Sequence, residues 1–121
     1  VETHQLAIGN EEKMISLSDD DFTQAKRVVG DGTIPMVTID SLDLYDVDLI
    51  KIDVEGFEME VLKGAENTLK NVDYIMIELN NNAKKYGSSN LEIEKHLRKS
   101  GYEILIKVWP DVVWRKKGGR K

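Results

Sequence analysis

Two carboxylates and a glycine lie between an apolar run and a helical pattern in this sequence. The segment 48–69, DLIKIDVEGFEMEVLKGAENTL, starts as an apolar strand and continues with the spacing of an amphipathic helix. Asp53, Glu55 and Gly56 occupy the turn between them. A carboxylate there could take a proton from a substrate hydroxyl, as a general base does. Acids before a helix also cap its first amides, and the spacing leaves both interpretations open.

A third carboxylate, Glu78, comes near the end of the next apolar run, YIMIEL at 74–79. An acid at the end of an apolar strand requires a polar partner. Ligands of open α/β sheets bind at the carboxyl ends of parallel strands. If the two strands are neighbours, Asp53, Glu55 and Glu78 converge on one edge of the sheet. Three acids can also ligate Mg²⁺, but no histidine is near them in sequence, and we expect no metal.

The elements that must position these acids alternate between strands and helices. Such alternation predicts an α/β sheet with parallel neighbours. The short connection at Pro110–Asp111 predicts that the last strand is antiparallel to the one before it. The expected strands are 48–52, 74–79, 102–108 and 112–115, and the expected helices are 57–71 and a second one that Ser89 caps and Gly101 ends.

Three details of these elements are also predicted. The apolar character of 48–52 is typical of a strand covered on both faces. Gly64 is a poor helix former, so its place inside the first helix predicts close packing there. His96 lies in a polar helical stretch and is expected at the surface.

The first 47 residues predict short strands and turns. Apolar stretches at 6–8, 14–17 and 35–39 are separated by glycine-containing turns. Ser18, followed by Asp19, Asp20 and Asp21, has the pattern of a helix N-cap with acids in the first turn.

Composition excludes several classes of function. A chain of 121 residues with 40% hydrophobic residues fits one domain with a core. Its net charge of −5 argues against nucleic-acid binding. The absence of cysteine excludes disulfides and thiolate chemistry. No apolar run reaches the ~18 residues of a membrane span, so we expect no membrane contact and a cytoplasmic location.

The stretches VDLIKIDVEGFEMEVLKGAENTL and DYIMIEL together resemble the second half of FkbM-type methyltransferases, which are S-adenosylmethionine-dependent O-methyltransferases. IPMVTIDSL at 34–42 and LAIGNEE at 6–12 resemble preceding parts of that family. The resemblance implies an α/β fold with a Rossmann-like sheet ordered 3-2-1-4-5-7-6, in which strand 7 is antiparallel. On this mapping 48–53, 74–79, 102–108 and 112–116 are strands 4, 5, 6 and 7.

The family's glycine-rich loop after strand 1 and its ribose-binding acid after strand 2 have no counterpart in this sequence. We therefore expect residues 1–121 to be the C-terminal part of one methyltransferase domain. Residues 1–47 would be an irregular region with a β hairpin, and 48–117 a βαβαββ core. Strand 4 would then have an open edge. The chain alone is expected to be inactive and to bind the cofactor poorly.

The resemblance assigns Asp53, Glu55 and Glu78 to the methyl-transfer site. It implies S-adenosylmethionine as cofactor and a hydroxyl of a small molecule or carbohydrate as acceptor. The cofactor-binding residues that it implies are Ala7, Ile8, Asp53 and Gly56. The competing interpretation is a truncated α/β interaction module without catalysis. The oligomeric state is left open.

Overall fold

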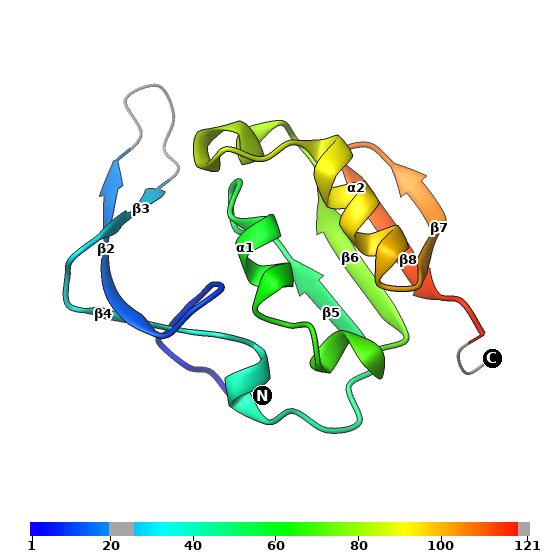
Figure 1. Cartoon of the computed structure of the whole chain (residues 1–121), viewed down its shortest axis with the longest axis horizontal. Coiled ribbons are helices and arrows are strands. Elements are labelled where there is room, and N and C mark those ends of the chain that lie inside the picture. Colours follow the sequence, from blue (N-terminus) through cyan, green and yellow to red (C-terminus); the bar gives the residue numbers. More distant parts are fainter. Residues whose placement is uncertain (20–25, 119–121) are drawn as a thin grey trace.

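The computed structural model describes residues 1–19 and 26–118, and they form a mixed α/β fold with two four-stranded sheets (Figure 1). The first sheet has the order β1-β4-β2-β3. Strand β1 is parallel to β4, whereas β2 is antiparallel to both β3 and β4. Its strands are β1 (Ala7–Ile8), β2 (Lys13–Asp19), β3 (Lys26–Gly30) and β4 (Ile34–Val37).

The second sheet has the order β5-β6-β8-β7. Strands β5 and β6 are parallel neighbours, and β8 is antiparallel to both β6 and β7. The parallel pair and the antiparallel last strand are therefore confirmed. The strands are β5 (Leu49–Ile52), β6 (Tyr74–Glu78), β7 (Tyr102–Val108) and β8 (Asp111–Lys116).

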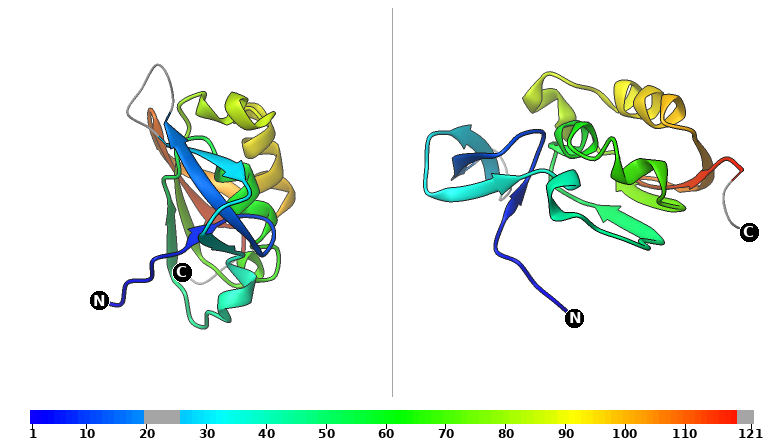
Figure 2. Two further views of the ribbon diagram at one scale, coloured as in Figure 1. Left: turned by 90° about the vertical axis from the view of Figure 1, so that its left-hand side faces the viewer. Right: turned by 60° about the horizontal axis from the view of Figure 1, so that its bottom comes forward.

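Helices cover one face of the second sheet, as the right-hand view of Figure 2 shows. Helix α1 spans Glu58–Lys63 and α2 spans Asn90–Lys99. Short 3-10 helices are η1 (Asp40–Leu42), η2 (Thr68–Lys70) and η3 (Asn82–Tyr86). The main core lies between the helices and the sheet and includes Ile52, Leu62, Ile75, Ile77, Leu97, Tyr102, Val112 and Trp114.

Strand β5 is not covered on both faces. It lies at an edge of the second sheet, and Leu49 is 53% exposed while Ile52 is only 3% exposed. The alternation follows from helices that pack against only one face among the described residues. The prediction that this strand is covered on both faces is therefore wrong for this structure.

The helix predicted over 57–71 is shorter than expected, because α1 ends at Lys63 and η2 follows separately. A Cβ atom at Gly64 would lie 2.2 Å from the carbonyl oxygen of Gly9, so the predicted close packing is confirmed. Beyond Gly64, the carboxylate of Asp40 accepts hydrogen bonds from the Asn67 and Thr68 amides at 3.0 and 2.8 Å. These contacts join η1 to the start of η2, where a new helical turn begins.

The two predicted N-caps had different outcomes. Ser18 lies in β2 opposite Arg27, so strand pairing takes the place of the predicted cap. Asp20 and Asp21 lie outside the described residues. Ser89 does cap α2, because its Oγ accepts the Glu92 amide at 3.2 Å.

Candidate active site

The carboxyl ends of β5 and β6 bring two of the predicted acids together. Ile52 pairs with Ile77 in the parallel register, so the residues that follow, Asp53 and Glu78, lie side by side. Their carboxyl groups are within hydrogen-bonding reach, and this bond is the main cause of a raised pKa for Glu78. Partial burial and the negative charges of Asp53 and Glu55 raise that pKa further.

Two asparagines fix the orientation of the acids. The Asn80 side chain donates to Glu78 Oε1 at 3.2 Å, and Asn82 donates to Glu55 Oε2 at 3.1 Å. The Asn82 amide in turn donates to the Asn80 side-chain oxygen at 3.1 Å. These asparagines were not among the site residues predicted from the sequence. The run of three asparagines directly after a strand end was the available signal.

The turn that carries Glu55 and Gly56 has a left-handed backbone. Glu55 has φ +51° and Gly56 has φ +106°. A Cβ atom at Gly56 would lie 2.3 Å from the Asn82 carbonyl oxygen. Glycine is required at position 56 both by its backbone angle and by this close approach. The turn and η3 thus pack against each other, which holds Glu55 beside its asparagine partner.

Helix capping by Asp53 or Glu55 is not what the structure describes. The Phe57 amide donates to the Val54 carbonyl at 3.2 Å, and Phe57, the N-cap residue of α1, provides no side-chain cap. The backbone of residues 54, 56 and 58 lowers the pKa of the nearby Glu58 carboxyl, whose Oε1 has no hydrogen-bond partner among the described residues. Asp53 and Glu55 are left exposed at the edge of the sheet, where a substrate can reach them.

Glu58 is a residue that sequence reasoning missed. It is only 2% exposed, and burial raises its pKa more than the turn amides lower it. The charge of Asp53 raises this pKa as well. Glu58, Val61, Leu62 and Ala65 have the spacing i, i+3, i+4, i+7 that is typical of one buried helix face. This spacing could have predicted that Glu58 is buried.

Ala7 and Ile8 lie in β1 of the first sheet rather than in the acid-bearing sheet. Ile8 packs against the main core. The next residue, Gly9, lies against Phe57, because a Cβ atom at Gly9 would be 3.0 Å from the Phe57 ring. The end of β1 therefore reaches the start of α1, but the described contacts do not join Ala7 or Ile8 to the carboxylates.

No group of three or more histidine, aspartate and glutamate side chains among residues 1–19 and 26–118 is arranged to hold a metal ion. No helix in the same residues is long and apolar enough to cross a membrane.

Comparison with known proteins gives two matches for this chain. Residues 2–104 match the methyltransferase FkbM domain. The chain is also 34% identical over 59 residues to the hexuronic acid methyltransferase AglP of Haloferax volcanii. That alignment covers 44% of this chain and 25% of AglP, so it spans about a quarter of the relative. No solved structure matches the chain. Because the domain match covers most of the chain, the protein belongs to the FkbM methyltransferase family.

Proposed function

We propose that this chain forms the acceptor-side part of an S-adenosylmethionine-dependent O-methyltransferase domain. In this proposal β5, β6, β8 and β7 take the places of strands 4, 5, 7 and 6 of a Rossmann-like sheet. The order β5-β6-β8-β7 and the antiparallel direction of β8 support that assignment. Among the described strands β5 pairs with β6 alone, which supports the assignment too, since strand 1 would pair with the other edge of β5.

The observation that carries the proposal is the Asp53–Glu78 carboxyl pair at the ends of two adjacent parallel strands. Methyl transfer to a hydroxyl releases the hydroxyl proton, and a carboxylate within reach can accept it. Asp53 is the more exposed member of the pair and is the candidate base, and Glu78, whose pKa is raised mainly by hydrogen bonding to Asp53, lies beside it. Glu55, oriented by Asn82, would accept a hydrogen bond from a second acceptor hydroxyl.

The residues present fit part of a cofactor site. Bound S-adenosylmethionine would supply a methyl group already activated by the positive charge on sulfur. Exposed carboxylates such as Asp53 suit a cationic ligand with ribose hydroxyls. The space beside Gly56 is filled by Asn82, so Gly56 would act through the shape of the turn. Ile8 would contribute apolar surface from β1, as a neighbour of α1.

The acceptor is proposed to be a carbohydrate, as the name of AglP states for that protein. Acidic and asparagine side chains are suited to hydrogen bonding sugar hydroxyls. A hexuronic acid carries its own carboxylate, which three clustered acids would repel. Such a sugar would have to bind with its hydroxyls toward Asp53 and its carboxylate away from the pair.

The test uses the longest expressed product that contains these 121 residues. Transfer of labelled methyl groups to a hexuronic acid and to the neutral hexose is measured for Asp53→Asn, Glu55→Gln and the control Asp43→Asn. Loss of a general base typically costs ~10²–10⁴-fold in rate, and we expect this for Asp53→Asn alone. Calorimetry with S-adenosylmethionine separates loss of binding from loss of chemistry. Parent-like turnover of Asp53→Asn, with unchanged circular dichroism, would refute the assignment of Asp53 as the base.

A further inference from the structure

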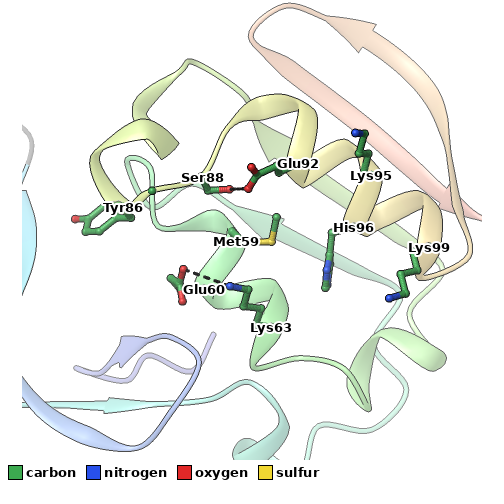
Figure 3. A pocket seen from close by; sticks show the side chains of 10 residues that line it. Met59, Glu60, Lys63, Tyr86, Ser88, Glu92, Lys95, His96 and Lys99 are labelled. Carbon is green, nitrogen blue, oxygen red and sulfur yellow. Dashed lines mark hydrogen bonds and ion pairs between the residues drawn. The ribbon is translucent and has the colours of Figure 1, made fainter.

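A cavity of about 290 Å³ lies between α1 and α2, next to the loop at 86–88 (Figure 3). It is on the helical side of the second sheet, whereas Asp53 and Glu78 lie at the strand ends. Asp53, Glu55 and Glu78 are not among the described residues that line this cavity, so the cavity is separate from the candidate active site. Side chains from both helices reach it.

His96 extends from α2 toward α1 at this cavity (Figure 3). Its Nε2 atom is buried and has no hydrogen-bond partner among the described residues. The imidazole is half-buried, so the expectation of a surface histidine is wrong. A buried polar atom without a partner is costly, and a bound group that accepts a hydrogen bond would remove that cost.

Positive charge lies on both sides of this imidazole. Lys63 of α1 and Lys99 of α2 line the same cavity, and Figure 3 shows Lys99 extending to the same side of α2 as His96. Burial lowers the pKa of His96, and these two lysines lower it further, against the opposing charge of Glu66. The two ammonium groups near the imidazole favour a bound anion, whereas the carboxylate of Glu66 opposes one. Three lysines and two glutamates are among the residues that line the cavity, so this lining has an excess of one positive charge in a chain whose net charge is −5.

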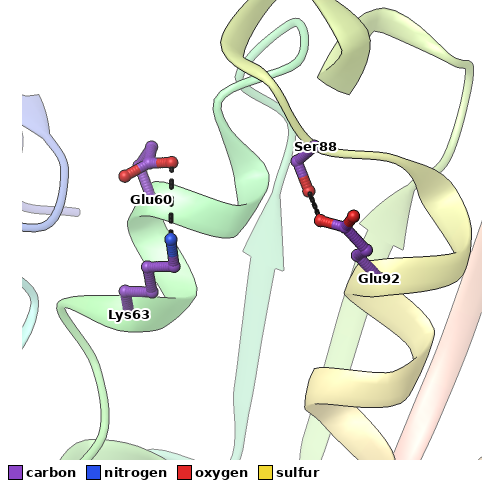
Figure 4. A network of polar contacts seen from close by, with 4 residues as sticks. All are labelled: Glu60, Lys63, Ser88 and Glu92. Carbon is purple, nitrogen blue, oxygen red and sulfur yellow. Dashed lines mark hydrogen bonds and ion pairs between the residues drawn. The ribbon is translucent and has the colours of Figure 1, made fainter.

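The carboxylates at the cavity are directed to other partners (Figure 4). Glu92 accepts a hydrogen bond from Ser88 at 3.3 Å. Glu60 pairs with Lys63 at 4.0 Å, the limit of an ion pair, and the Lys63 side chain is 55% exposed. Lys63 can therefore turn toward a bound anion with little loss. The remaining charged group at the cavity, Lys95, points away from His96 in Figure 3.

We propose that this cavity binds a dianionic phosphoryl group. Nε2–H of His96 donates one hydrogen bond to it, and Lys63 and Lys99 neutralise its two charges from opposite helices. Two ammonium groups with one neutral donor match a phosphate or phosphate monoester better than a carboxylate, which carries a single charge. The source can be free phosphate or a phosphorylated small molecule, since both present the same group.

The test is a nuclear magnetic resonance titration of the full chain with inorganic phosphate and with glucose 1-phosphate, each against sodium chloride of equal ionic strength. The chain has two histidines, and exposed His4, which pairs with Glu2 at 3.0 Å, serves as an internal control. We expect saturable shifts of the His96 imidazole and an upward shift of its pKa with phosphate, while His4 follows the chloride curve. Tighter binding of glucose 1-phosphate than of inorganic phosphate would identify a phosphorylated molecule as the ligand, and the reverse order would identify free phosphate.

Lys99→Gln is the decisive variant, because this lysine is exposed and its replacement leaves the core intact. Loss of one charge-assisted contact should weaken phosphate binding about tenfold at low salt. Lys84→Gln removes the same charge from an exposed position outside the cavity and should leave binding unchanged. Equal, non-saturating shifts at His4 and His96, or equal effects of the two lysine variants, would overturn the proposal.

Discussion

The contact between Asp40 and the start of η2 allows a stability prediction with a defined size and pH dependence. The Asp40 carboxylate accepts the amides of Asn67 and Thr68 and the Thr68 hydroxyl, at 3.0, 2.8 and 2.7 Å. A carboxylate that caps a helical turn contributes ~1 kcal/mol, and loss of the most effective caps costs about 2 kcal/mol. Because three donors lose one acceptor, we expect Asp40→Ala to lower the free energy of unfolding by about 2 kcal/mol.

The pH dependence follows from the lowered pKa of Asp40. Burial alone would raise that pKa, but the amide and hydroxyl donors outweigh it and lower the pKa below its ordinary value of 3.8. A carboxyl whose pKa is depressed on folding stabilises the protein above its unfolded value and loses that contribution as pH falls through its folded value. The difference between parent and variant should therefore be full at pH 7 and shrink below about pH 4.

Urea unfolding followed by tryptophan fluorescence measures this difference, since Trp114 is fully buried. The control is Asp43→Asn, which removes an exposed carboxylate three residues away and keeps a residue type that tolerates the left-handed backbone at this position. The reasoning fails if the two variants unfold at the same urea concentration at pH 7. It also fails if the loss caused by Asp40→Ala is as large at pH 2.5 as at pH 7.

Two further predictions concern the acid edge. Asp53→Asn should lower the pKa of Glu78 toward its ordinary value, because the main cause of the raised pKa is removed. Titration of the glutamate carboxyl groups by carbon-detected nuclear magnetic resonance measures this pKa, and an unchanged Glu78 midpoint in the variant would contradict the prediction. Gly56→Ala should cost about 3 kcal/mol in denaturant unfolding, since positive φ and a backbone clash act together. Gly87→Ala has positive φ but open space, so it should cost about 1 kcal/mol; equal costs at the two glycines would count against the clash.

Local pattern predicted the acid-bearing edge because strand ends and helix starts are encoded by neighbouring residues. Asp53 and Glu78 were placed together by two apolar runs and one rule about parallel strands. The raised pKa of Glu78 could not be predicted, because it depends on side-chain distances across the sheet. The supporting side chains, Asn80 and Glu58, were missed because each one's role depends on a partner that only the folded chain brings near.

Non-local pairing explains the larger differences. Strand β1 pairs with β4 across 28 intervening residues, and short strands carry little sequence signal for such partners. Helix α1 ends early because Gly9 and Asp40, both distant in sequence, pack at Gly64 and η2. The exposed face of β5 could not be predicted from its composition, since the sequence of an apolar strand does not show whether another layer covers its second face.

The parallel register of β5 and β6 determines both the packing of the strands against the core and the distance between the carboxyl groups of Asp53 and Glu78. Ile52 and Ile77 are buried in the core and pair in register, so Asp53 and Glu78, the residues that follow them, emerge together at the strand ends. Inserting one residue within β5 would either turn its isoleucines away from the core or shift Asp53 out of line with Glu78. Selection for a dry core therefore also preserves the distance between the two acids, and the titration of Glu78 can serve as a spectroscopic measure of correct strand alignment in any variant of this domain.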